Sequence, residues 1–255
     1  MKVIIIGGNG FVGSAYKRFC EKNSIDHLIV NRHNYHDYIG TKADILINAN
    51  GNSKKFLATQ EPLVDFDASV RSLRQSLIDF PCDKYVFLSS CDVYSDCSSY
   101  ESTKEDVVID ISKQSPYGFH KYLAELCVQH CHHDWLIFRM GGFVGENLKK
   151  NAIFDILWGD HLWLHPESKL QYINTDIAAM KVMEIIKKGY SQEIFNLCGN
   201  GVIELQEVLN MTNREVEINT EAKPVHYEVN IDKIQSVTDI PSTRDAVIDF
   251  VQSNR

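Results

Sequence analysis

The sequence lacks an excess of positive charge, and this absence excludes some classes of function. Its 26 lysines and arginines are outnumbered by 34 aspartates and glutamates, which gives a formal net charge of −8. A protein that binds nucleic acid usually has a basic face, and binding to an anionic membrane surface needs clustered basic residues as well. We therefore expect no nucleic-acid partner and no membrane partner.

The sequence also lacks long apolar runs and a disulfide framework. No apolar run approaches the roughly 20 residues of a membrane-spanning helix, and the run at residues 3–6 is too short for a signal peptide. Seven cysteines are an odd number without framework spacing, in a chain of 255 residues that is long enough to build a core without disulfides. We expect reduced thiols and a cytoplasmic location.

What the sequence does contain is an alternation of strand and helix patterns. Apolar, β-branched runs predict strands at residues 2–6, 27–30, 44–47, 84–90 and 135–140. Helical spacing of apolar residues predicts helices at residues 11–23, 63–80, 117–130 and 176–188. Strands that alternate with helices predict an α/β fold with a doubly wound parallel sheet. Beyond residue 140 the pattern loosens, which indicates a smaller lobe.

A glycine-rich turn separates the first predicted strand from the first predicted helix. The stretch "GGNGFVG" places Gly7, Gly10 and Gly13 three residues apart, and Phe11 and Val12 lie at the start of the helix. In a dinucleotide-binding turn these glycines allow a sharp bend, the approach of a pyrophosphate and the packing of helix against strand. The N–H groups at the start of the helix then bind the anion. The turn therefore predicts a nucleotide site.

A tyrosine and a lysine stand one helical turn apart in "QSPYGFHKYLAE". Tyr117 and Lys121 are an i,i+4 pair on one helix face, after Ser115 as the cap and Pro116 at the first helical position. An ammonium near the phenol would lower the pKa of Tyr117 and make it an acid/base near neutral pH. The alternative is an ordinary helix start whose tyrosine and lysine are solvated.

Four motifs together resemble the extended short-chain dehydrogenase/reductase family. They are the three glycines of "GGNGFVG", "INANG" after a middle strand, "FLSSCDVY" and "PYGFHKYLAE". Later segments such as "FRMGGFVG", "YINTDIA" and "IFNLCGN" resemble the family as well, so the resemblance covers nearly the whole chain. It implies a Rossmann-type dinucleotide-binding domain at residues 1–140. Residues 141–255 would form a small C-terminal substrate-binding lobe with returning elements packed on the sheet.

The resemblance also implies roles for individual residues. Tyr117 would be the general acid/base, Lys121 would hold the nicotinamide ribose and lower the pKa of the tyrosine, and Ser90 would hydrogen-bond the substrate oxygen. The segment Asn48, Ala49 and Asn50 would pass under the cofactor.

Three further positions are candidates for contact with the substrate. Asp92 lies where dehydratases of the family have an acid, and Cys91 lies where many of them have a first acid. A turn-forming aspartate is the alternative for Asp92, and a small buried residue is the alternative for Cys91. Gly142 replaces an asparagine that many nucleotide-sugar enzymes of the family have there.

The end of the second predicted strand bears on which nucleotide is bound. It reads "LIVNRHNY", with Asn31 and Arg32 and without the acid that binds the ribose of NAD. A guanidinium can bind a 2′-phosphate bidentately, so the sequence favours NADP, with NAD as the alternative. Residues 32–43 are too few for the usual further strand and helix.

The stretch "CVQHCHHDW" at residues 127–135 raises the question of a metal site. No second ligand pair with zinc spacing accompanies its cysteines and histidines, so we expect no metal. The apolar stripes of residues 63–80 and of the Tyr117 helix would suit the four-helix homodimer interface that is common in the family.

Three hypotheses for function follow. The first is an NADP-dependent ketoreductase that acts on a small molecule, a nucleotide-linked keto-deoxysugar being the favoured class. The second is a nucleotide-sugar epimerase or dehydratase that retains tightly bound NAD and uses Asp92 as an additional acid/base. The third is a non-catalytic nucleotide sensor or scaffold on the same fold.

Overall fold

A computed structural model describes residues 1–255 except Ser53, Asn213, Thr220 and Arg255. Its contacts divide the chain into two compact units, each made of three segments. The first unit comprises Met1–Ser95, Val108–Met140 and Ala179–Phe195, and the second comprises Asp96–Val107, Gly141–Ala178 and Asn196–Arg255. The predicted boundary after residue 140 is one of the points where the chain passes between the units, which are more interleaved than two consecutive halves.

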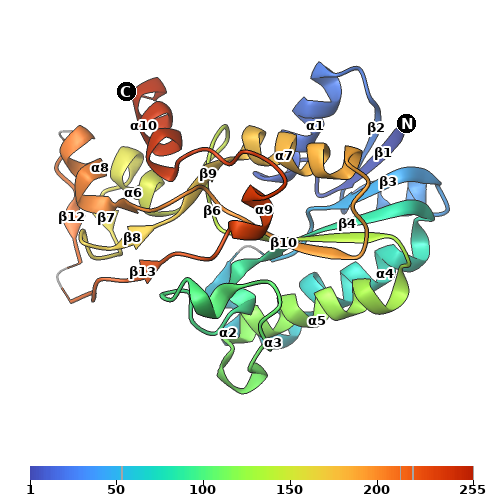
Figure 1. Cartoon of the computed structure of the whole chain (residues 1–255), viewed down its shortest axis with the longest axis horizontal. Coiled ribbons are helices and arrows are strands. Elements are labelled where there is room, and N and C mark those ends of the chain that lie inside the picture. The colour runs from blue at the N-terminus through green and yellow to red at the C-terminus, as the bar shows by residue number, and fades with distance from the viewer. Residues whose placement is uncertain (53, 213, 220, 255) are drawn as a thin grey trace. The chain divides into compact units, whose positions relative to one another are not determined.

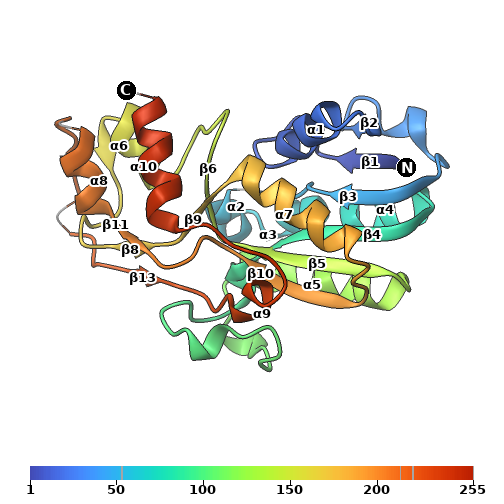
Figure 2. The ribbon, with the colours of Figure 1, turned by 45° about the horizontal axis from the view of Figure 1, so that its top comes forward.

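A six-stranded sheet forms the centre of the first unit (Figures 1 and 2). Its order is β10-β5-β4-β3-β1-β2. The strands are β1 (Lys2–Ile6), β2 (Asp26–Val30), β3 (Ala43–Asn48), β4 (Cys82–Ser90), β5 (Trp135–Met140) and β10 (Glu193–Leu197). The first five strands pair in parallel. All five predicted strands are present, and the doubly wound parallel sheet is confirmed.

Helices cover both faces of this sheet, with α4 and α5 on one face and α1 and α7 on the other (Figures 1 and 2). The helices are α1 (Gly13–Lys22), α2 (Lys55–Gln60), α3 (Pro62–Phe66), α4 (Ser72–Asp79), α5 (Pro116–Cys131) and α7 (Thr175–Lys187), of which α7 enters the first unit at Ala179. Short 3₁₀ turns are η1 (Tyr35–Tyr38), η3 (Cys91–Val93) and η5 (Ile111–Lys113). Between β2 and β3 only η1 occurs, as the short spacing of residues 32–43 predicted.

The predicted helix at residues 63–80 is divided rather than uniform. A π-helical turn, η2 (Asp67–Arg71), lies between α3 and α4. The wider turn shifts the apolar stripe around the helix axis, because π geometry places more residues in each turn. Val70 and Leu73 are buried, whereas Leu63 upstream of the π turn is 79% exposed.

The core on the α4/α5 face explains why these elements pack. It joins side chains from five strands and two helices: Ile4, Ile6, Val30, Ala43, Leu46, Leu73, Phe80, Tyr85, Phe87, Ala124, Val128, Trp135 and Ile137. Strands covered on both faces bury nearly all of their side chains, and this produces the continuous apolar runs seen in the sequence.

The second unit consists of short strands and helices whose pattern the sequence did not predict in detail. The parallel pair is β6 (Gly142–Val144) with β9 (Tyr172–Asn174), and the three-stranded sheet is β11 (Ile203–Glu204), β8 (Lys169–Leu170) and β13 (His226–Tyr227). A second pair is β12 (Glu217–Ile218) with β7 (His161–Leu162). The helices are α6 (Ala152–Trp158), α8 (Leu205–Thr212), α9 (Asp232–Gln235) and α10 (Thr243–Ser253), with η4 (Glu101–Thr103) as a 3₁₀ turn.

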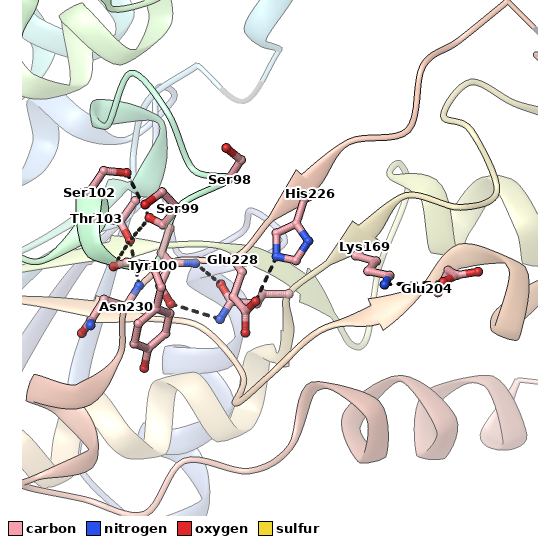
Figure 3. A network of polar contacts seen from close by, with 12 residues as sticks. Ser98, Ser99, Tyr100, Ser102, Thr103, Lys169, Glu204, His226, Glu228 and Asn230 are labelled. Atoms are coloured by element: carbon pink, nitrogen blue, oxygen red, sulfur yellow. Dashed lines mark hydrogen bonds and ion pairs between the residues drawn. The ribbon is translucent and has the colours of Figure 1, made fainter.

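A polar network joins the Asp96–Val107 segment to the rest of the second unit (Figure 3). The backbone N–H of Asn230 donates to Thr103 Oγ1 at 2.9 Å, and the backbone N–H of Glu228 donates to the carbonyl of Cys97 at 2.8 Å. Asn196 Nδ2 donates to the carbonyls of both Thr103 and Asn230. These bonds explain why a segment that follows β4 directly in the chain belongs to the second unit.

Two general findings complete the description. Among the helices of the described residues, none is both long and apolar enough to cross a membrane. Within the same residues no disulfide is formed.

Candidate active site

The glycine-rich turn after β1 is as tight as the sequence predicted. Gly7 has φ +81°, a conformation that favours glycine, and a Cβ added to Gly13 would lie 2.2 Å from the Gly7 carbonyl oxygen. Helix α1 begins at Gly13, and its N-cap Val12 makes no side-chain capping bond. Phe11 lies in the turn, where its carbonyl accepts from Ser14 Oγ. The uncapped N-terminus of α1 therefore fits the pyrophosphate of a dinucleotide.

The end of β3 lies against this turn. A Cβ added to Gly7 would lie 3.0 Å from the Ala49 carbonyl oxygen. Asn48 is buried, its Nδ2 donates to Tyr85 Oη at 2.7 Å, and its Oδ1 accepts from the backbone N–H of Asn50. The sheet order reverses between β1 and β3, and ligands of doubly wound sheets bind at the carboxyl ends of such strands. The structure thus brings the predicted cofactor residues Gly7 and Asn48 to Asn50 to one place.

The end of β2 separates the roles of the two residues predicted to select NADP. Asn31 Oδ1 accepts from the backbone N–H of His33 at 2.9 Å, and the backbone N–H of Asn31 donates to Asn34 Oδ1 at 2.7 Å. These bonds fold the chain into a local turn that occupies the Oδ1 of Asn31. Arg32 is exposed. A contact of Arg32 with a 2′-phosphate stays a prediction.

Ser90 ends β4 and belongs to a chain of polar contacts. Its Oγ donates to Asp92 Oδ2 at 2.9 Å and accepts from the backbone N–H of Asp92 at 3.2 Å. The Asp92 carboxylate also forms an ion pair with Lys55 Nζ of α2, at 2.7 Å to each oxygen. The hydroxyl proton of Ser90 is thus directed to a carboxylate that a lysine neutralises.

Helix α5 places Tyr117 beside Ser90. The helix begins as predicted, with Ser115 Oγ accepting from the backbone N–H of Gly118 at 3.1 Å and Pro116 in the first turn. A Cβ on Gly118 would lie 2.0 Å from the Asp92 carbonyl oxygen, so the helix touches the backbone of η3 at this glycine. The Tyr117 hydroxyl forms a hydrogen bond with Ser90.

The direction of the tyrosine pKa differs from the expectation. Burial and the Asp92 carboxylate raise the pKa of Tyr117 above its usual value of 10.0, and the Ser90 hydrogen bond lowers it by less. Lys121 Nζ lies 6.0 Å from the centre of the Tyr117 ring, and its charge does not offset this rise in pKa. Without cofactor, Tyr117 is therefore a phenol that holds its proton at neutral pH.

Lys121 is itself buried in this site. Its Nζ lies 5.2 Å from the centre of the Phe87 ring, and a Cβ on Gly51 would lie 3.0 Å from the same nitrogen. Burial lowers the pKa of Lys121 to about 8. The lysine thus changes charge within the working range of many proteins.

The remaining substrate candidates have structural roles of their own. Cys91 is completely buried and its thiol donates to the Arg139 carbonyl, which leaves only its backbone for a substrate contact. Gly142 belongs to the second unit, where a Cβ would lie 2.5 Å from the Gln171 carbonyl oxygen. Close packing of β6 on β9 accounts for this glycine, and its contact with substrate stays a prediction.

Sequence reasoning missed several residues of the site. No role was assigned to four residues that contact the site residues described above or act on Lys121, namely Lys55, Gly118, Asp65 and His120. Gly118 carried a usable signal, since glycine in a helix is unfavourable without a local reason. The others gave none, because their partners are distant in sequence.

The histidine- and cysteine-rich end of α5 contacts the start of β4. His132 Nε2 lies 3.5 Å from Cys82 Sγ and 3.2 Å from the Cys82 carbonyl oxygen. Across the described part of the chain, no group of three or more histidine, cysteine, aspartate or glutamate side chains is arranged to hold a metal ion.

Comparison with known structures finds the same fold in nucleotide-sugar enzymes. A UDP-galactose 4-epimerase is 18% identical, with 99% of this chain and 98% of that chain covered and a TM-score of 0.81. The dTDP-4-dehydrorhamnose reductase of Bacillus anthracis in complex with NADP is 15% identical, with 99% of each chain covered and a TM-score of 0.82. MoeE5 in complex with UDP-glucose and NAD is 13% identical, with 99% and 98% covered and a TM-score of 0.83. The predicted Rossmann-type fold is confirmed.

Sequence comparison defines the family. Among the curated proteins, none matches this chain significantly. The profile of the NAD dependent epimerase/dehydratase family matches residues 3–153, which is more than half of the chain and includes the glycine-rich turn, Ser90, Tyr117 and Lys121. The resemblance to the extended short-chain dehydrogenases/reductases is thereby confirmed, and the chain belongs to the NAD dependent epimerase/dehydratase family.

Proposed function

We propose that the protein is an NADP-dependent ketoreductase that acts on a nucleotide-linked keto-deoxysugar. The observation that carries the proposal is the state of Tyr117. Its side chain is buried and hydrogen-bonded to Ser90, and burial raises its pKa, which favours the phenol over the phenolate. A phenol in this state is prepared to give a proton to an oxygen, as the reduction of a ketone requires.

Side chains of the first unit would donate the proton and stabilise the charges that develop in such a reduction. A bound reduced nicotinamide would supply the hydride to the carbonyl carbon. Tyr117 would give its phenolic proton to the carbonyl oxygen, and the ammonium of Lys121 would stabilise the phenolate that remains. Ser90 would turn its proton from Asp92 to the substrate oxygen and stabilise the developing negative charge.

The surroundings of Ser90 favour reduction over dehydration. A dehydratase needs acid and base groups beyond the tyrosine, and the two candidate positions here are Cys91 and Asp92. The Cys91 thiol is completely buried. The Asp92 carboxyl group is engaged by Lys55 and by Ser90, so its contacts orient the serine and leave it less available as an additional acid/base.

The end of β2 supports NADP over NAD. The Oδ1 of Asn31 is occupied by the local turn, and Arg32 is exposed beside it. A guanidinium attracts the 2′-phosphate that distinguishes NADP from NAD. The substrate class rests on the family and on similar folds, among them a dTDP-4-dehydrorhamnose reductase in complex with NADP. The homodimeric state rests on the apolar stripes of residues 63–80 and of the Tyr117 helix.

The first experiment identifies the nucleotide. The purified protein is denatured, any released nucleotide is identified by mass spectrometry, and the emptied protein is titrated with NADPH and NADH. An empty site that prefers NADPH supports the reductase. NAD that stays bound through purification favours the epimerase or dehydratase, and binding of neither nucleotide favours the scaffold hypothesis.

The second experiment tests the reaction. NADPH oxidation is followed with dTDP- and UDP-linked keto-deoxysugars, for the wild type and for Tyr117→Phe and Asp92→Asn. We expect Tyr117→Phe to lose the general-acid contribution, roughly 10²–10⁴-fold in kcat. Asp92→Asn should retain most of the activity of a reductase, whereas a dehydratase would lose its activity with this change. Full turnover by Tyr117→Phe would refute the proposed role of the phenol.

A further inference from the structure

Lys121 is a buried ammonium that needs a compensating negative charge. Its side chain is only 5% exposed, and burial alone works against its charged form. Three carboxylates act on it and favour the charged form, in the order Asp65, Glu125 and Asp92. Which of them balances the lysine depends on what else each carboxylate binds.

Two of the three carboxylates already have a cation of their own. Glu125 accepts from Arg139 Nε and Nη2 at 2.8–3.3 Å, in a pair that is almost fully buried. Asp92 pairs with Lys55 at 2.7 Å. Each of these pairs is close to neutral as seen from Lys121, because opposite charges at contact distance cancel at longer range.

Asp65 of α3 has no such partner among the described residues. Its side chain is completely buried, and its Oδ2 lies 2.6 Å from Nδ1 of His120. Its Oδ1 accepts from Asn52 Nδ2 at 2.7 Å and lies 3.5 Å from Ser69 Oγ. An amide, a hydroxyl and an imidazole N–H satisfy the oxygens without a fixed positive charge.

The geometry brings this carboxylate toward the lysine. A Cβ placed on Gly51 would lie 3.0 Å from Lys121 Nζ and 3.9 Å from Ser69 Oγ, so both groups face the same glycine. That serine hydroxyl is the one beside Asp65 Oδ1. His120 precedes Lys121 on α5, and the rings of Phe66 and Phe119 pack around its imidazole.

We propose that Asp65 is the buried counter-charge of Lys121, and that Asn52 and His120 hold its carboxylate in place for this role. Asp65 is then a positioning residue that keeps Lys121 protonated where its ammonium is needed. The importance of this charge for turnover rests on the proposed function, but the charge pairing itself does not.

The charge of His120 also contributes to the net charge of the Asp65–His120 pair beside Lys121. A neutral imidazole can donate from Nδ1 to Asp65, which leaves the pair with one negative charge. The titratable and charged groups on the surrounding elements are Tyr117 and Glu125 of α5, Asp92 of η3, Lys55 of α2 and Arg139 of β5.

The test measures the titration of Lys121 in the protein without added cofactor or substrate. Protein labelled with ¹³C at lysine Cε is titrated by NMR, and the Lys121 resonance is assigned with Lys121→Met. We expect a midpoint near pH 8 for the wild type. In Asp65→Asn the midpoint should fall by roughly 1–2 pH units, because an opposite charge nearby is lost.

Two further variants make the test decisive. Asp67→Asn removes an exposed carboxylate two residues away, which pairs with Arg71, and the midpoint should not change. His120→Leu removes the side-chain donor that holds Asp65, so the midpoint should fall by less than in Asp65→Asn, which tests the proposal even where Asp65→Asn does not fold. An unchanged midpoint in Asp65→Asn, or an unchanged one in His120→Leu where Asp65→Asn does not fold, would overturn the proposal.

The proposal and the proposed function can fail separately. The NMR titration involves no turnover, so its result is the same whether the protein is a reductase, an epimerase or a scaffold. Conversely, a confirmed counter-charge together with no reduction of any keto-sugar would contradict only the proposed function.

Discussion

The buried pair of Glu125 and Arg139 offers the sharpest test of how the catalytic end of the sheet is stabilised. Glu125 lies on α5, one helical turn after Lys121, and Arg139 lies on β5, next to Ser89 in the register with β4. The side chains are 0% and 2% exposed. Ser89 Oγ donates to Glu125 at 2.6 Å, and Arg139 Nη1 donates to Tyr94 Oη at 2.8 Å. We predict that Glu125→Gln is strongly destabilising.

The magnitude follows from the charge that the substitution leaves behind. Glutamine can still accept from Ser89, but Arg139 would stay buried without a counter-charge. Although burial lowers the pKa of Arg139, the Glu125 carboxylate raises it further, so the charged guanidinium depends on this partner. Breaking a buried ion pair from one side costs about 3–5 kcal/mol. The retained hydrogen bonds place Glu125→Gln at the lower end, about 3 kcal/mol. For a chain of this length that lowers the Tm by roughly 6–12 °C.

The assay is urea and thermal unfolding followed by circular dichroism, with Glu21→Gln as the matched control. Glu21 makes an exposed i,i+4 pair with Lys17 at 3.7 Å, and its loss should cost no more than about 0.5 kcal/mol. A double-mutant cycle adds Arg139→Met, and the double variant should cost clearly less than the sum of the two single variants. Additive effects, or equal effects of Glu125→Gln and Glu21→Gln, would refute the reasoning.

Three further predictions concern the site and the assembly. Gly118→Ala must move α5 away from the Asp92 carbonyl, so turnover should fall roughly 10²-fold. Gly40→Ala has no atom within 4 Å of its Cβ but strains the backbone at φ +84°, so it should cost stability and leave the turnover of the folded protein unchanged, and equal losses of turnover would contradict the steric argument. Arg32→Glu should weaken NADPH binding at least about tenfold in a fluorescence titration and spare NADH; parallel losses would exclude a 2′-phosphate contact. Leu126→Asp, at a position 42% exposed on α5, should convert the predicted dimer to a monomer in light scattering, and an unchanged mass would exclude this interface.

The sequence predicted the central sheet well because strands buried on both faces appear as continuous apolar runs. The strand "WLIFRM" is β5 in full, since every one of its side chains is buried. The glycine-rich turn was equally visible, because Gly7 and Gly13 meet steric limits that any other residue would violate. Tyr117 and Lys121 were found through helical spacing and a family motif.

The features that the sequence did not predict depend on contacts distant along the chain. Lys55 meets Asp92 across 37 residues, and Asp65 meets His120 across 55. The helix predicted over residues 63–80 contains the π turn η2, which the spacing of its apolar residues did not predict. The second unit is built from strands of two or three residues, too short for any periodicity to be recognised.

The predicted lowering of the Tyr117 pKa was wrong because it, too, depends on contacts distant along the chain. The direction of this shift also bears on which direction of the reaction is favoured. Spacing shows that a lysine is near a phenol, but not that Asp92 and Asp65 lie near as well and that the phenol is buried among them. A raised pKa keeps Tyr117 protonated at neutral pH, while the pKa of Lys121 falls to about 8. Reduction should therefore be constant with pH below about 8 and decline above it, as Lys121 loses the charge that stabilises the phenolate. Oxidation of an alcohol needs the phenolate from the start, so its rate should rise with pH over the same range, and a reduction rate that rises through pH 8 would contradict this assignment.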